Sequence, residues 1–124
     1  MVRGALGRGG NVVIPSFALE RSQEILYVLR EAVARGELPS PLPAFLDSPM
    51  AVSAVEVYRR HPECYDAEAA ALIARGGDLF AFPGLQLVRD AEGSKALNRL
   101  RGAVLIAGSG MCTGGRIRHH LVNN

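Results

Sequence analysis

The sequence has 124 residues, which is enough for one domain with one hydrophobic core. Hydrophobic residues make up 48% of it, and this fraction excludes an intrinsically disordered chain. Aromatic residues make up only 6%, with no Trp, which argues against a module that stacks nucleic-acid bases on exposed aromatic side chains. The formal net charge of +2 is too small to indicate a nucleic-acid partner by composition alone.

The two cysteines, Cys64 and Cys112, form no C-x-x-C pair and no disulfide framework. Free cysteines fit a reducing compartment. The sequence shows no signal peptide and no apolar stretch long enough to span a membrane. We therefore expect a cytoplasmic protein without a membrane partner.

The first third of the chain alternates between helix and strand signals. Residues 1–10 resemble the end of a helix terminated by a glycine pair, so the chain is expected to begin inside an element. β-branched residues over 11–15 predict a buried strand. Ser16 is a candidate N-cap for a helix over 17–35. The apolar stripe of that helix consists of Ile25, Leu29, Ala32 and Val33.

The middle of the chain repeats this alternation. Residues 44–47 predict a strand. Ser48 followed by Pro49 is a favourable start for a helix that extends to about Arg60. Alanine-rich residues over 66–74 predict another helix.

The last third contains two further strand–helix units. Residues 85–88 predict a strand, and 90–100 predict a helix weakened by Gly93. An apolar strand over 103–107 then leads into a glycine-rich loop and a basic helix. Strands that alternate with helices predict an α/β fold: three layers around a mainly parallel, Rossmann-like sheet of about four strands.

Three of the predicted strand-to-helix loops share one feature. Each offers a serine at or near a helix start: Ser16, Ser48 and Ser109. Ligands of such folds bind at the carboxyl edge of the sheet, where these loops converge. We therefore expect all three serines to line the same rim, although helix capping alone also explains serines at these positions.

The glycine-rich loop after the last strand has two interpretations. Its glycines leave the backbone unobstructed, and amides at a helix start attract anions. Arg116 and Arg118 follow directly, so the loop is a candidate phosphate contact. A tight strand-to-helix connection is the simpler interpretation. The residues that we expect to contact phosphate are Ser109, Gly110, Arg116 and Arg118, with Ser16 and Ser48 beside them.

Four segments together resemble the beta-CASP domain of metallo-beta-lactamase-superfamily RNA nucleases: GGNVVIPSFALERSQE, LDSPMA, SKALN and AGSGMCTGGRIRHHL. This family includes bacterial relatives of the nuclease subunit of the polyadenylation cleavage factor and, more distantly, RNase J. The resemblance implies a domain inserted into a metallo-beta-lactamase nuclease domain. It also implies two zinc ions between the two domains and RNA as the substrate in the cleft.

The resemblance gives one residue a specific role. The family's first beta-CASP motif ends in an acidic residue in the pattern P-x-F-A-x-x-R-x-Q-E, which matches Glu24. The implied role is to orient a histidine of a later motif near the scissile phosphate. From the residues alone, the favoured interpretation of Glu24 is a solvent-exposed helix carboxylate or a partner of Arg21 one turn away.

The nuclease signature H-x-H-x-D-H is absent from this sequence. Its three histidines are His61, His119 and His120, and scattered histidines do not build a two-metal site. We therefore interpret 1–124 as a truncated beta-CASP domain that lacks the metallo-beta-lactamase domain. The expectation is no metal site and no nuclease activity in this chain alone. The expected partners are RNA and the missing domain.

Two other functions remain open at this point. Residues 112–118 fit C-x-x-G-x-x-R, the phosphate loop of cysteine-dependent phosphatases, in which Cys112 would attack the phosphoryl group and Arg118 would clamp it. Alternatively, the chain is a non-catalytic assembly module. In that case the exposed face of the helix that contains Ile25 and Leu29, or an open sheet edge, would form a homodimer.

Overall fold

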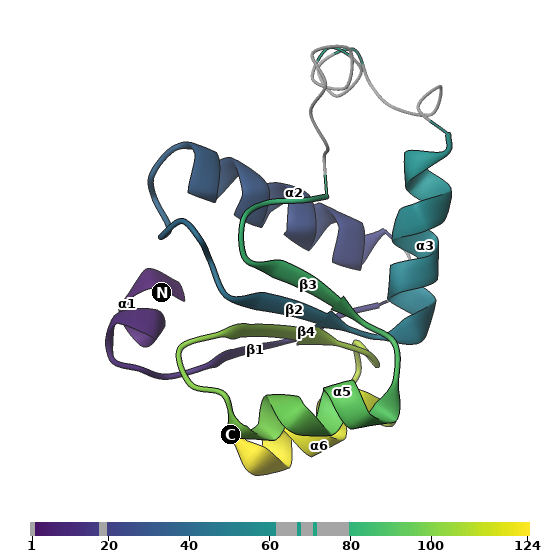
Figure 1. The fold of residues 1–124 in the computed structure, drawn as a ribbon. Helices are drawn as coiled ribbons and strands as arrows, with labels where there is room; N and C mark the ends of the chain where they lie inside the picture. Colours follow the sequence, from purple (N-terminus) through teal and green to yellow (C-terminus); the bar gives the residue numbers. More distant parts are fainter. Residues whose placement is uncertain (1, 18–19, 62–66, 68–70, 72–79) are drawn as a thin grey trace.

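Four strands form a parallel sheet within the part of the chain that the computed structural model describes, residues 2–17, 20–61, 67, 71 and 80–124 (Figure 1). They are β1 (Val12–Pro15), β2 (Ala44–Asp47), β3 (Leu85–Val88) and β4 (Val104–Ala107). The order is β1-β4-β2-β3, and each neighbouring pair runs parallel. The predicted parallel sheet is thereby confirmed, and two strands have the predicted bounds.

Helices cover both faces of the sheet, as predicted. The helices α2 (Arg21–Ala34) and α3 (Pro49–Arg59) lie on one face (Figure 1). The other face carries α5 (Ala91–Ala96), the short 3-10 helix η2 (Leu97–Arg99) and α6 (Arg116–Asn123). A further helix, α1 (Val2–Gly7), precedes β1. The architecture is therefore a three-layer α/β domain.

Alternation along the two central strands divides the core into two layers. Leu46 of β2 and Ile106 of β4 pack in the larger apolar cluster with residues of α2 and α3. Phe45 and Leu105 pack in the smaller cluster, which includes Leu97 of η2. Because successive side chains of a strand point to opposite faces, the last residue of β2 lies on the same face as Phe45. That residue is Asp47, an acidic group on the inner side of the α5–α6 layer.

The start of α3 agrees with the prediction, whereas the start of α2 does not. The Ser48 hydroxyl accepts a hydrogen bond of 3.3 Å from the Ala51 amide and caps α3. Helix α2 begins at Arg21, and Glu20 before it has a positive φ of 63°. Ser16 is therefore not the cap of α2, contrary to the prediction. Its buried hydroxyl lies 2.9 Å from that of Ser22 instead.

The apolar stripe of α2 packs against the sheet, so only the opposite face of this helix is open to a second copy. Leu29 is only 5% exposed, and Ile25 packs against the core cluster beside it. Val28 on the other face is 63% exposed, and a dimer through this exposed face stays a prediction. The strands β1 and β3 form the two edges of the sheet, and pairing through an edge stays a prediction.

Some predictions lie outside the described residues. These include most of the predicted helix over 66–74 and the first cysteine, Cys64. Where the chain is described again, Asp90 caps α5 through a hydrogen bond of 3.2 Å from the Gly93 amide. Within the described ranges, no helix has the length and apolar character needed to cross a membrane.

Candidate functional site

A pocket of about 450 Å³ lies at the carboxyl edge of the sheet. Loops that follow β1, β2 and β4 line it, because parallel strands deliver their carboxyl ends to one edge. The lining residues are Ser16, Phe17, Asp47, Ser48, Pro49, Met50, Gly108, Ser109, Gly110, Gly115 and Arg116. The predicted convergence of the three serine-bearing loops is thus confirmed.

The glycine-rich loop between β4 and α6 is closed by its own hydrogen bonds. The Ser109 hydroxyl accepts a bond of 3.2 Å from the Thr113 amide, and the Ser109 carbonyl accepts one of 3.2 Å from the Cys112 amide. The Ile117 amide donates to the Gly108 carbonyl at 2.9 Å. These amides hold the loop against the end of β4 and are not directed at a ligand.

Asp47 is the centre of a buried polar cluster that links β2 to both helices of its layer. The side chain is 0% exposed. One carboxylate oxygen accepts a bond of 2.6 Å from Arg116, and the other faces His120 Nε2 at 2.6 Å and accepts a very short bond from Ser94. Arg116 also donates to the Arg89 carbonyl at 2.7 Å. The cluster fixes α5 and α6 against the sheet.

The environment of Asp47 keeps its carboxyl group ionised. Burial raises the pKa of Asp47, but hydrogen bonds from His120, Ser94 and Arg116, together with the charge of Arg116, outweigh burial and hold this pKa below its usual value. Because an ionised carboxylate only accepts hydrogen bonds, His120 donates through Nε2–H. The buried Nδ1 of His120 has no hydrogen-bond partner among the described residues.

This arrangement predicts an acid-sensitive fold. A carboxyl group whose pKa is lower in the folded than in the unfolded state stabilises the protein above the unfolded-state pKa of about 3.9. That contribution is lost as the pH falls through the folded-state pKa of Asp47. We expect denaturant titrations to show stability falling below about pH 5, and Asp47→Asn to show a smaller dependence. An unchanged dependence in this variant would assign the acid sensitivity to other groups.

The two predicted phosphate-binding arginines are separated by the geometry of α6. Arg116 lines the pocket and is 22% exposed, whereas Arg118 lies outside it and is exposed. Residues two apart on a helix point about 200° apart, so both guanidinium groups cannot grip one phosphate. Within the described residues, the Arg118 side chain makes no hydrogen bond or ion pair. Phosphate contact by either residue stays a prediction.

The other predicted site residues differ in how accessible they are to a ligand in the pocket. The hydroxyls of Ser48 and Ser109 line the pocket and are half-buried, and Gly110 lies beside them. Ser16 also lines the pocket, but it is 1% exposed and its hydroxyl bonds to Ser22. Ser16 therefore acts first as a structural residue of the turn after β1.

Glu24 is exposed on the first turn of α2 and does not line the pocket. Its carboxylate lies 3.5 Å from the Arg21 guanidinium, and both side chains are 64% exposed. Such a surface ion pair contributes little to stability. The pair therefore gives Glu24 no strong structural role, and its orienting role stays a prediction.

The loop geometry does not support the cysteine-phosphatase alternative. Cys112 has a positive φ of 60° and does not line the pocket. Helix α6 begins only at Arg116, so Cys112 does not lie at its amino terminus. The amides of Cys112 and Thr113 bond to oxygens of Ser109 in the same loop, so neither is directed at a phosphoryl group.

The described residues do not fit a zinc ion. They contain no group of three His, Cys, Asp or Glu side chains that would hold a metal. Asp47 and His120 lie together, but each uses the other as its hydrogen-bond partner.

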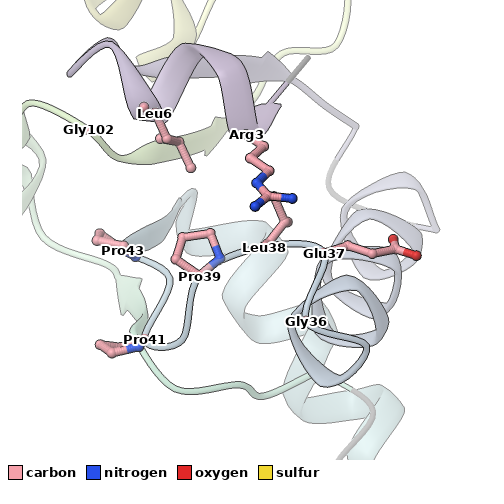
Figure 2. Close-up of a pocket in the computed structure, with 10 residues that line it drawn as sticks. Arg3, Leu6, Gly36, Glu37, Leu38, Pro39, Pro41, Pro43 and Gly102 are labelled. Carbon is pink, nitrogen blue, oxygen red and sulfur yellow. The ribbon is translucent and has the colours of Figure 1, made fainter.

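A second pocket of about 430 Å³ lies at the amino edge of the sheet (Figure 2). The loop over 36–43, α1 and Gly102 form it, and Pro39, Pro41 and Pro43 line one side. Arg3 and Glu37 are its charged lining residues. None of the predicted site residues line this pocket, so the carboxyl edge remains the candidate site.

Comparison with known proteins agrees with this geometry. The model of the Beta-Casp domain family matches residues 22–124. The chain belongs to the beta-CASP domain family. It is 47% identical over 94% of its length to ribonuclease TTHA0252 of Thermus thermophilus, and covers 26% of that protein. It is 33% identical over 97% of its length to the transcription termination factor FttA of Methanosarcina mazei, and covers 19% of it.

Three of the four beta-CASP segments converge in space on the buried polar cluster. LDSPMA supplies Asp47, SKALN supplies Ser94, and the last segment supplies Arg116 and His120. Sequence reasoning missed this cluster. The available signal was an acidic residue that ends an otherwise apolar strand, since a buried carboxylate requires partners. The cluster positions Arg116 at the pocket that the glycine-rich loop lines.

Proposed function

We propose that this chain binds the RNA backbone as the beta-CASP domain of a zinc-dependent RNA-processing nuclease. The observation that carries the proposal is the pocket at the carboxyl edge, where three loops meet beside Arg116. The ribonuclease and termination-factor relatives support RNA as the ligand. The chain spans about a quarter or less of these relatives. Zinc and hydrolysis are assigned to a metallo-beta-lactamase domain, and we expect no RNA hydrolysis by this chain alone.

The pocket offers hydrogen-bond donors for phosphate oxygens. The Ser48 oxygen accepts a bond from the Ala51 amide, so its own hydroxyl hydrogen is left to donate. The guanidinium of Arg116 has five N–H groups, and its bonds to Asp47 and to the Arg89 carbonyl use one on each terminal nitrogen. The remaining groups are held in position before a ligand arrives, which reduces the entropy cost of binding.

Arg116 is a poor first choice for a binding variant, because its removal leaves the Asp47 carboxylate buried without its cation. Arg118 is the sharper choice. We expect Arg118→Ala to weaken binding to short single-stranded RNA and to reduce the slope of log affinity against log salt by about 0.7, the value for one phosphate contact. Titration by fluorescence anisotropy at several salt concentrations measures both quantities.

The matched control is Arg35→Ala, which removes the same charge at the opposite edge of the sheet. Arg35 follows the end of α2 and is 66% exposed, with only a long ion pair of 3.8 Å to Glu31. We expect this variant to keep the wild-type salt slope. Equal slopes for both variants would remove Arg118 from the interface, and no binding by the wild type would contradict the proposed function.

A further inference from the structure

Phe17 is an aromatic side chain left open at the rim of the pocket. It is the second residue after β1 and lines the pocket, yet it is 54% exposed. Met50 lines the same pocket and is 69% exposed. The low aromatic content of the sequence argued against base stacking, but one aromatic ring at the right place is sufficient for one base.

The ring of Phe17 rests on the glycine-rich loop. A Cβ atom placed on Gly110 would lie 2.9, 3.0 and 3.0 Å from three consecutive ring carbons, Cδ2, Cε2 and Cγ. Nearly equal distances to three consecutive carbons place Gly110 over the face of the ring, because an approach in the ring plane would leave the outer two carbons farther away. One face is therefore supported by the loop.

The backbone of Phe17 is also held in place. Its carbonyl accepts hydrogen bonds of 2.7 Å from the Ser22 hydroxyl and 3.2 Å from the Ser22 amide. Because the Ser22 hydroxyl donates to this carbonyl, the Ser16 hydroxyl at 2.9 Å donates to the Ser22 oxygen and holds it in place. A ring fixed before binding loses little conformational entropy when a ligand covers it.

The surroundings of the ring identify the chemistry of its ligand. An apolar surface formed by Phe17 and Met50 shares the pocket with Ser48, Ser109 and Arg116. A flat ring system would stack on the apolar surface, and an anion would accept hydrogen bonds from the two serines and Arg116. One nucleotide combines both groups within a single unit.

We propose that Phe17 is a stacking platform for one unpaired base of the RNA strand whose backbone contacts the glycine-rich loop. The inference rests on the proposed function and adds the subsite that selects single-stranded over duplex RNA, since a base held in a helix presents no free face. The site reads the presence of a base and not its identity, because every base has a stacking face.

The experiment compares two ligands of equal length, a short single-stranded RNA and the same backbone with abasic riboses. We expect the wild type to bind the RNA more tightly than the abasic strand. Phe17→Ala should lose about 5- to 100-fold in affinity for the RNA and nothing for the abasic strand. Phe17→Tyr should retain wild-type affinity for both. Val57→Ala, which shortens a 50% exposed side chain on α3, should change neither.

The outcomes separate this inference from the proposed function. Binding of both ligands by the wild type, with no change in Phe17→Ala, overturns the platform and leaves the backbone contact in place. In that case the apolar surface formed by Phe17 and Met50 would instead contact another protein segment. An equal loss for both ligands assigns Phe17 to loop structure and also overturns the inference. Binding of neither ligand by the wild type contradicts both proposals.

Discussion

Replacing Asp47 with alanine is expected to lower the free energy of unfolding by about 3–5 kcal/mol and the Tm by roughly 10 to 20 °C. The variant leaves Arg116 and the buried His120 without the carboxylate that each contacts at 2.6 Å. It also removes the acceptor of the Ser94 hydroxyl. Breaking one side of a buried ion pair costs more than the pair contributes, because the remaining charge stays desolvated. Chemical and thermal denaturation measure the loss.

Asp90→Ala is the matched control for this prediction. The same side chain is removed, but Asp90 is exposed and caps α5 through one bond of 3.2 Å to the Gly93 amide. Loss of such a cap costs about 1 kcal/mol. The double variant Asp47→Ala/Arg116→Met should recover part of the stability, because it removes the unpaired cation. If Asp47→Ala is no more harmful than Asp90→Ala, the buried cluster does not stabilise the fold.

The second large effect is expected at Gly115, directly before α6. This residue has φ 76° and ψ −173°, a region that is essentially restricted to glycine. A Cβ atom here would lie 2.5 Å from the Gly108 carbonyl oxygen and 3.1 Å from the Ser109 nitrogen. Both are backbone atoms of the same loop and cannot rotate away. We expect Gly115→Ala to cost about 2–4 kcal/mol and to weaken RNA binding through displacement of the loop.

The neighbouring glycine provides the control. A Cβ atom on Gly114 would have no heavy atom within 4 Å outside its two chain neighbours, and Gly114 does not have a positive φ. Gly114→Ala should therefore be neutral or stabilise the protein by up to about 1 kcal/mol. Gly115→Ala should have both a lower denaturation midpoint and a lower RNA affinity than Gly114→Ala. Similar behaviour of both would show that the loop adapts freely and that Gly115 is not required for its shape.

The strands were the elements that the sequence predicted best. Residues 85–88 and 44–47 are bounded by turn signals and match the observed strands β3 and β2. The helix after β1 was less predictable. It was expected from residue 17 and begins at Arg21, because Ser16 and Ser22 bond to each other and Glu20 adopts a positive φ. The preference for serine at helix starts predicts a cap at Ser16, but it cannot predict that Ser16 bonds to Ser22 instead.

The sequence by itself determined the α/β class, the parallel sheet, the family and the loops that meet at one edge. The fold class, the sheet and the meeting of the loops follow from local periodicity, turn chemistry and the rule that parallel strands end on the same side. The family follows from the resemblance of four sequence segments to beta-CASP domains. Only the tertiary structure decided which polar groups meet. Ser94, Arg116 and His120 lie 47, 69 and 73 residues from Asp47 in the chain, and no local pattern pairs them. It likewise decided that Phe17 stays exposed, since burial depends on how distant elements pack.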